Sequence, residues 1–259
     1  MLFRSSNMDE WIFNNQDIGR EIKEAIKIRD HRDIFVIMGN PPYNLSSQNN
    51  CAWINEKLGE YKEGLDEKNQ KILADDYVKF LRFGQWKIEQ VGTGVLAFIT
   101  NNKYFDGQMF SVMRKSLRKT FDHIYIVNLH GDMRKNESGN PFDIRVGVGI
   151  AIMVRSNNSP NKHAASHYMD VPHATREEKF AVLGQGFDES HFRLLPETQK
   201  NYFVEMNTDL LEHYESFIPI NRLFKAEPTS GIMVGRDRLL MDVDPAVVEE
   251  NLRDRKSVV

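Results

Sequence analysis

An asparagine, two prolines and a tyrosine follow directly after an apolar stretch, and these residues are the best suited to chemistry in the sequence. Residues 34–38 are apolar, β-branched and aromatic, which predicts a fully buried strand. Asn40 offers an amide oxygen and Pro41 a backbone carbonyl, so two acceptors can converge on one NH2 group. Pro42 stiffens the arm, and Tyr43 adds a flat ring that can stack on a planar group. When two protein acceptors bind both N–H bonds of an amine on an aromatic ring, they favour a more tetrahedral nitrogen with a more available lone pair. Such an arrangement stabilises the transition state in which that nitrogen attacks.

Helices and strands alternate around this arm and must position it. We expect further strands at 95–100, 123–129 and 146–154, and helices at 17–29, 74–91 and 108–120. The last strand has no room for a helix before it, so we expect it to pair antiparallel at a sheet edge. The polar stretch 44–71 predicts either a lid or a solvated excursion. In open α/β sheets, ligands bind at the carboxyl ends of the strands, where Asn40 stands.

The stretch Asn40-Pro41-Pro42-Tyr43 after an apolar strand resembles the catalytic motif of amino-methyltransferases that use S-adenosylmethionine, in particular those that methylate adenine N6 in DNA. Residues 100–107 and 128–132 are similar to later stretches of large single-polypeptide restriction-modification enzymes, in the same order. The resemblance implies an α/β fold. This would be the C-terminal half of a Rossmann-like methyltransferase sheet with an antiparallel last strand, followed by a partial mixed α+β region.

The resemblance also implies a mechanism and its partners. Adenine would be flipped out of double-stranded DNA. Tyr43 would stack on it, with Phe142 a candidate for the other face, although a loop aromatic packed into the core is an equal alternative. Asn40 Oδ1 and the Pro41 carbonyl would accept the N6 protons, while Asn40 is also a candidate to line the S-adenosylmethionine site. The other cofactor-binding residues remain unassigned.

The glycine-rich cofactor turn of the family should precede residue 34, and the 33 residues before it contain no such turn after a strand. We therefore expect a fragment or one piece of a split enzyme, completed by a polypeptide that supplies the N-terminal half. The expected division is a partial catalytic domain at 1–155, a connecting region at 156–220 and the truncated start of a target-recognition region at 221–259. Residues 229–237 resemble the opening of such a region, and an ordinary hairpin explains them equally well.

Composition narrows the class of protein. The chain has 259 residues, a net charge of -3 and one cysteine, Cys51, which favours a reducing cytoplasm. It has no apolar run of membrane length. We expect no metal site, because His163, His167 and His173 are too loosely spaced. A basic group on the third helix predicts either phosphate contacts or a solvated face: Arg114, Lys115, Arg118 and Lys119.

Two other functions fit the sequence. The motif also resembles that of methyltransferases acting on a glutamine side-chain amide in proteins, which likewise offers two N–H groups and a flat face. The second alternative is a non-catalytic remnant that only binds DNA or a partner chain, and the missing glycine-rich turn favours it.

Overall fold

A computed structural model describes residues 16–218, except 32, 46, 66–69, 143, 157–162, 172–174, 208–209, 211–212 and 215, together with residues 222 and 246. The chain divides into two compact units at residues 206 and 207, and the first contains the sheet and all the helices named below. The stretch at 229–237 and His173 lie outside the described residues.

The first unit is built on a mixed sheet of six strands in the order β1-β2-β4-β3-β5-β6. Strand β1 is parallel to β2, β4 is antiparallel to both β2 and β3, and β5 is parallel to β3. The strands are β1 (Val36–Gly39), β2 (Gly94–Asn101), β3 (His123–His130), β4 (Val148–Arg155), β5 (Ala165–Asp170) and β6 (Arg193–Leu194).

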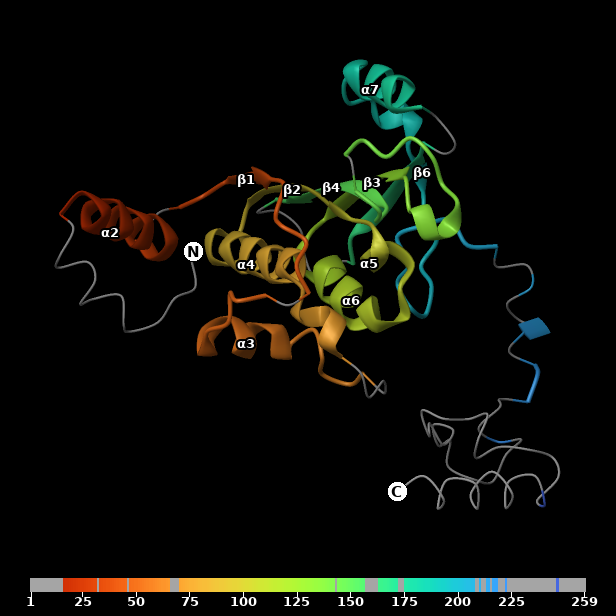
Figure 1. The fold of residues 1–259 in the computed structure, drawn as a ribbon, viewed down its shortest axis with the longest axis horizontal. Helices are drawn as coiled ribbons and strands as arrows, with labels where there is room; N and C mark the ends of the chain where they lie inside the picture. Colours follow the sequence, from red (N-terminus) through yellow and green to blue (C-terminus); the bar gives the residue numbers. More distant parts are fainter. Residues whose placement is uncertain are drawn as a thin grey trace. The chain divides into compact units, whose positions relative to one another are not determined.

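Helices lie on both sides of the sheet: Figure 1 shows α4 and α6 on one side and α7 on the other. The α-helices are α2 (Gln16–His31), α3 (Ala52–Gly59), α4 (Asp76–Val91), α5 (Lys103–Asp106), α6 (Ser111–Thr120) and α7 (Arg176–Gly184). The short 3₁₀ turns are η1 (Lys71–Ala74), η2 (Gln108–Phe110), η3 (Met133–Lys135) and η4 (Glu189–His191). The helices and strands expected from sequence patterns are therefore confirmed in type and order, with bounds that differ by a few residues.

The main core lies between the sheet and the α4–α6 layer. Alternate residues of β2, β3 and β4, such as Leu96, Ile126 and Met153, pack against buried residues of α4 and α6, such as Leu81 and Leu117. This alternation follows from the period of two along a strand, since every second side chain faces the same helices. On the opposite face, a smaller cluster of described residues joins the ends of β3 and β5 to α7.

The strand before the motif was expected to be fully buried, and this was wrong. Val36 is 60% exposed and Met38 is 75% exposed. Among the described strands, β1 stands first in the sheet and pairs only with β2, so one edge and one face lack protein neighbours.

The antiparallel strand was also misplaced. Antiparallel pairing of β4 is confirmed, but β4 lies inside the sheet between β2 and β3 and not at its edge. The reason is that β5 and β6 continue the sheet beyond β3. The sheet thus extends past residue 155, into the stretch that we expected to be a connecting region.

The polar stretch after the motif holds more structure than a solvated excursion. It contains α3, whose Ile54 and Leu58 are fully buried, and Tyr61 and Leu73 join the same side of the core. The apolar residues are too widely spaced among polar ones for the pattern to be visible in sequence.

The four basic residues of α6 differ in burial. Arg114 and Arg118 are buried, and they donate to backbone carbonyls of Tyr104, Gly107 and Ala164. These two side chains are therefore structural, contrary to both expectations, whereas Lys115 and Lys119 are exposed. No described helix is both long enough and apolar enough to span a membrane.

Candidate active site at the carboxyl edge of the sheet

Four parallel strands end at one edge of the sheet. Because β1, β2, β3 and β5 run in the same direction, the segments that follow them emerge together. The motif follows β1 and the loop 131–147 follows β3, so the fold brings these two sequence-predicted segments to a common edge.

The motif residues differ in burial. Pro41 is buried, Asn40 and Pro42 are exposed, and Tyr43 is half-buried. The Tyr43 hydroxyl donates to Asn40 Oδ1 at 3.3 Å and lies 3.5 Å from the Ile99 carbonyl of β2, while its ring meets Tyr77 edge-on. Burial raises the pKa of Tyr43 to about 12, so the hydroxyl stays neutral and remains a donor.

The first turn of α4 holds the arm that follows the motif. Asp75 accepts the Asn44 N–H at 2.8 Å, and the Asp76 N–H donates to the Asn44 carbonyl at 3.3 Å. This two-way contact fixes the residue next to Tyr43. Burial raises the pKa of Asp75, against the opposing effect of the N–H groups that it accepts.

The same turn also orders residues 47–50. Asp76 accepts hydrogen bonds from Ser47 and Asn49, and the Lys79 ammonium donates to Ser47 Oγ at 2.7 Å and to Asn50 Oδ1 at 2.8 Å. Lys79 is fully buried, and burial lowers its pKa. Asp75 and Lys79 were not predicted as parts of the site, because their only signal in the sequence is the acidic pair Asp75-Asp76 at the start of a helix.

A chain of polar side chains links the ends of β2, β3 and β5. Asn102 donates to Asn128 Oδ1 at 2.9 Å, Asn128 donates to the Tyr168 hydroxyl at 3.1 Å, and Tyr168 donates to Asp170 at 2.7 Å. His130 Nε2 lies 2.6 Å from the same Asp170 oxygen. This chain fixes the spacing of the three strand ends at the edge where the motif lies.

Phe142 lies in the loop 131–147, where its N–H donates to Asn140 Oδ1 at 2.9 Å. It is half-buried, and no ring contact joins it to Tyr43 within the part of the chain that the structure describes. Its stacking role therefore stays a prediction.

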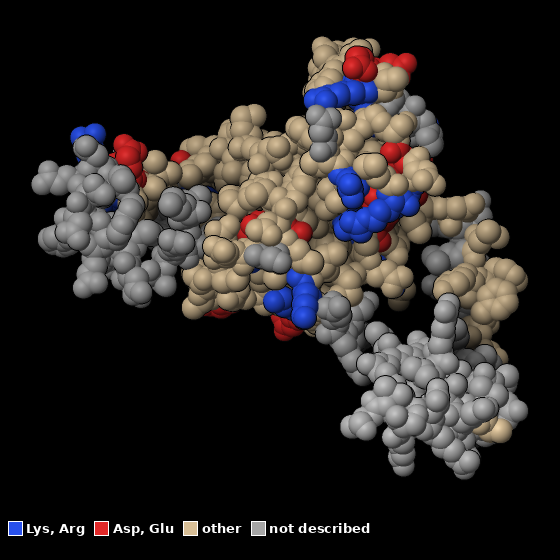
Figure 2. Space-filling model, in the orientation of Figure 1, with Lys and Arg blue, Asp and Glu red and all other residues tan. Residues whose placement is uncertain are grey.

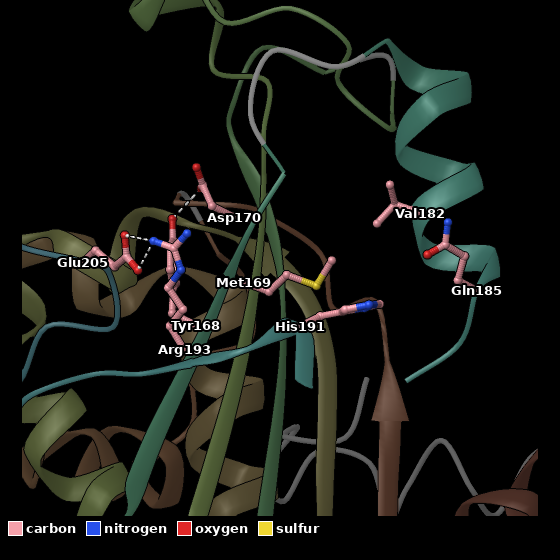
Figure 3. Close-up of a pocket in the computed structure, with 8 residues that line it drawn as sticks. All are labelled: Tyr168, Met169, Asp170, Val182, Gln185, His191, Arg193 and Glu205. Carbon is pink, nitrogen blue, oxygen red and sulfur yellow. Dashed lines mark hydrogen bonds and ion pairs between the residues drawn. The ribbon is translucent and has the colours of Figure 1, made fainter. Parts of the chain in front are cut away.

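A cavity of about 530 Å³ opens at the end of β5 beside α7 (Figure 3). No motif residue lines it, and its charged groups satisfy one another: Arg193 pairs with Glu205 at 3.0 Å, and Tyr168 donates to Asp170. It shares Tyr168 and Asp170 with the polar chain described above. Its lining residues are Tyr168, Met169, Asp170, Val182, Gln185, His191, Arg193 and Glu205.

Among the described residues, the candidate site consists of the Asn40 and Pro41 oxygen acceptors and the Tyr43 ring on the arm after β1. No described group of three or more His, Cys, Asp or Glu side chains is arranged to hold a metal ion. Residues 16–31, which precede β1 in the chain, form α2 and supply no glycine-rich turn after a strand. The described residues therefore do not by themselves fit S-adenosylmethionine.

Comparison with known proteins bears on this geometry. The model of the Eco57I restriction-modification methylase family matches residues 4–134. Among solved structures, the chain is similar to "ATP-dependent Type ISP restriction-modification enzyme LlaBIII bound to DNA", with 25% identity, a TM-score of 0.67, and coverage of 89% of this chain and 17% of that one. No curated protein sequence matches it.

Two further structures share the fold. A nuclease-deletion mutant of the Type ISP enzyme LlaGI, in complex with a DNA substrate mimic, has 23% identity and a TM-score of 0.68 over 90% of this chain and 24% of its own. A DrdV–DNA complex has 24% identity and a TM-score of 0.66 over 90% of this chain and 26% of its own. The chain thus spans about a sixth to a quarter of the length of these structures.

The expected fold class is confirmed, since the chain forms a Rossmann-like α/β methyltransferase sheet with an antiparallel strand. The match to the family model covers half of the chain and includes the Asn40–Tyr43 motif together with the β1, β2 and β3 strands that carry the candidate site. This chain belongs to the Eco57I restriction-modification methylase family.

Proposed function

We propose that this chain forms the acceptor-binding part of an S-adenosylmethionine-dependent methyltransferase that acts on adenine N6 in DNA, within a restriction-modification system. The observation that carries the proposal is the Asn-Pro-Pro-Tyr motif at the carboxyl end of β1, with the Asn40 amide exposed and Pro41 buried. Buried packing on one side and an exposed acceptor on the other suit an arm that grips a substrate.

The chemistry assigned to the motif is recognition of one amine. Asn40 Oδ1 and the Pro41 carbonyl accept the two N6 protons of a flipped adenine, which directs the nitrogen lone pair away from the ring. Tyr43 stacks on the base, with Phe142 proposed for its other face. S-adenosylmethionine would supply the methyl group when a cofactor-binding half holds it. The residues above bind and orient the base that receives it.

The open edge of β1 supports a second part of the proposal, a polypeptide that supplies the cofactor-binding half. Val36 and Met38 are exposed, and none of the described strands pairs with the outer edge of β1, so this edge can pair with a further parallel strand. The site would act on double-stranded DNA in the cytoplasm.

Radiolabelled methyl transfer tests the proposal. The chain, alone and with candidate N-terminal halves, is incubated with labelled S-adenosylmethionine and an adenine-containing duplex, with a control duplex in which 2-aminopurine replaces adenine and removes the 6-amino group. We expect label only on the adenine duplex.

Asn40→Ala should lower the rate of methyl transfer by about a hundredfold or more, as removal of a transition-state acceptor does. Equal labelling of both duplexes, or full activity of Asn40→Ala, would contradict the proposal. Label on glutamine peptides alone would favour the protein-methylating alternative.

The non-catalytic alternative has its own support, because no cofactor turn lies in the described residues and β1 is open. Calorimetric titration of S-adenosylmethionine separates the two. Saturable binding by the chain with its partner favours the enzyme, whereas absence of binding with DNA binding retained favours the remnant.

A further inference from the structure

We propose that the η3 turn and Arg145 form a contact for the DNA backbone, in which Arg134, Lys135 and Arg145 bind phosphates and Met133 packs between them against the sugar-base edge. This inference rests on DNA being the substrate, as proposed above, and it assigns the strand contact of that same site. It concerns residues that the motif chemistry does not use.

The first observation is a group of exposed cationic side chains on neighbouring backbone. Arg134, Lys135 and Arg145 are all exposed, and the Met133 N–H donates to the Arg145 carbonyl at 3.3 Å, which places the three cations on adjacent backbone. Figure 2 shows a group of Lys and Arg side chains near the position of α5 in Figure 1, with Asp and Glu atoms beside them.

The acidic residues of the loop do not cancel this charge at the surface. Asp132 is buried and accepts the Arg134 N–H, and Glu137 is half-buried and accepts the Asp132 N–H. The exposed acid in contact is Asp106, which lies 3.7 Å from Lys135. Such an exposed pair is weak and can be exchanged for a phosphate.

The second observation is an exposed apolar side chain among these cations. Met133 is 59% exposed. A flexible thioether surrounded by positive charge matches a nucleic acid strand, which offers phosphates on the outside and apolar sugar and base edges between them.

The third observation is that the turn is held rigidly. Asn140 donates to the carbonyls of both stems of the loop, Gly131 at 3.0 Å and Val146 at 2.8 Å. The buried Lys179 ammonium adds hydrogen bonds to the Leu129 and Ser138 carbonyls at 2.7 and 3.1 Å. A preorganised turn loses little conformational freedom when it binds.

The distance between the η3 turn and the motif also fits a contact with the same DNA duplex. The turn follows β3 and the motif follows β1, three strand spacings apart in the sheet, which is roughly 14–15 Å. With about 3.4 Å of rise per base pair, this corresponds to roughly four base pairs along a duplex. The turn therefore reaches phosphates that flank the proposed flipped base and not the base itself.

Fluorescence anisotropy with a labelled mixed-sequence duplex tests the inference on the full chain. The variant Arg134→Gln/Arg145→Gln is compared with Lys115→Gln/Lys119→Gln, which removes the same charge from exposed positions on α6, a helix that leads to the opposite edge of the sheet. Between about 50 and 200 mM salt, each lost phosphate contact should reduce the slope of log affinity against log salt by about 0.9. We expect a reduction of about 1.8 and a loss of affinity of about tenfold for the first variant, and changes within about twofold for the second. Met133→Gln should weaken binding by about threefold with an unchanged slope, because it removes an apolar contact and no charge.

Equal losses for the two double variants, unchanged slopes, or no measurable binding by the wild-type chain at low salt would overturn the inference. Circular dichroism of each variant confirms that it is folded. The assay measures binding and not methyl transfer. Slope changes confined to the Arg134 and Arg145 variant would therefore support the contact even if methylation of adenine were disproved.

Discussion

At the level of single residues, the motif combines a buried proline, an exposed amide and a half-buried ring. Pro41 anchors the arm while Asn40 stays accessible, and Tyr43 joins them through its hydroxyl. The residue types alone predicted an acceptor pair and a stacking ring. The hydrogen bond from Tyr43 to Asn40 was not predictable, because it depends on how the arm folds back over β2.

This hydrogen bond gives a first prediction. Tyr43→Phe removes the donor at 3.3 Å from Asn40 and keeps the ring, so methyl transfer should fall by about tenfold, the worth of one positioning hydrogen bond. Tyr43→Leu also removes the ring and should cost a further tenfold or more through lost stacking. Steady-state rates on an adenine duplex measure both, and identical rates for the two variants would exclude stacking.

Glu137 gives a second prediction, on pH. Burial alone would raise the pKa of Glu137, but the Asp132 N–H and His130 outweigh burial and lower it. A carboxyl group with a lowered folded-state pKa stabilises the fold at pH values above its unfolded pKa, near 4.3, and this contribution is lost as pH falls through the folded value. Glu137→Gln should therefore be less stable than wild type at neutral pH, with the difference shrinking in acid. Thermal melts from neutral to acid pH measure this, and a difference that grows in acid would contradict it.

At the level of elements, the N-terminal turn of α4 holds the segment that follows the motif. This turn binds residue 44 and residues 47–50 through Asp75, Asp76 and Lys79, so a helix of the core positions the segment that follows the motif. The periodic elements were predictable because their apolar residues recur at fixed spacing. The placement of β4 within the sheet, and of β5 beside β3, depends on pairing between distant segments, which one sequence does not encode locally.

Lys79→Met gives a third prediction. The substitution keeps much of the buried stem and removes the hydrogen bonds to Ser47 and Asn50, which should cost about 1–3 kcal/mol of unfolding free energy. Amide exchange at residues 47–50 should rise more than elsewhere. Lys115→Met, at an exposed position, is the matched control and should change neither the unfolding free energy nor the exchange rates. If Lys79→Met raised amide exchange equally across the whole chain, Lys79 would not act locally on residues 47–50.

Gly149 gives a fourth prediction. A Cβ atom at this position would lie 2.3 Å from Phe105 Cε2 and 3.1 Å from the Val127 carbonyl. Gly149→Ala should therefore lower the unfolding free energy by about 1–3 kcal/mol through overpacking. Gly59→Ala is the control, because nothing lies within 4 Å of its Cβ position in α3, and it should be neutral or stabilising. Denaturant unfolding of both variants gives the comparison.

At the level of the first unit, the exposed side of β1 is the dominant feature. Within the part of the chain that the structure describes, no strand pairs with the outer edge of β1, and its Val36 and Met38 are exposed, which favours association. We expect the isolated chain to self-associate with rising concentration in sedimentation experiments, and Met38→Lys to reduce this without lowering the melting temperature. An unchanged association constant for Met38→Lys would mean that another surface is responsible.

The antiparallel course of β4 has a consequence for engineering. Since β4 runs back between its neighbours, the loop 131–147 begins and ends at the same edge of the sheet, and Asn140 ties both stems together. The loop can therefore be exchanged for that of a relative of different length, provided that the asparagine and its two carbonyl partners are kept. The strands that flank the loop should then retain their register.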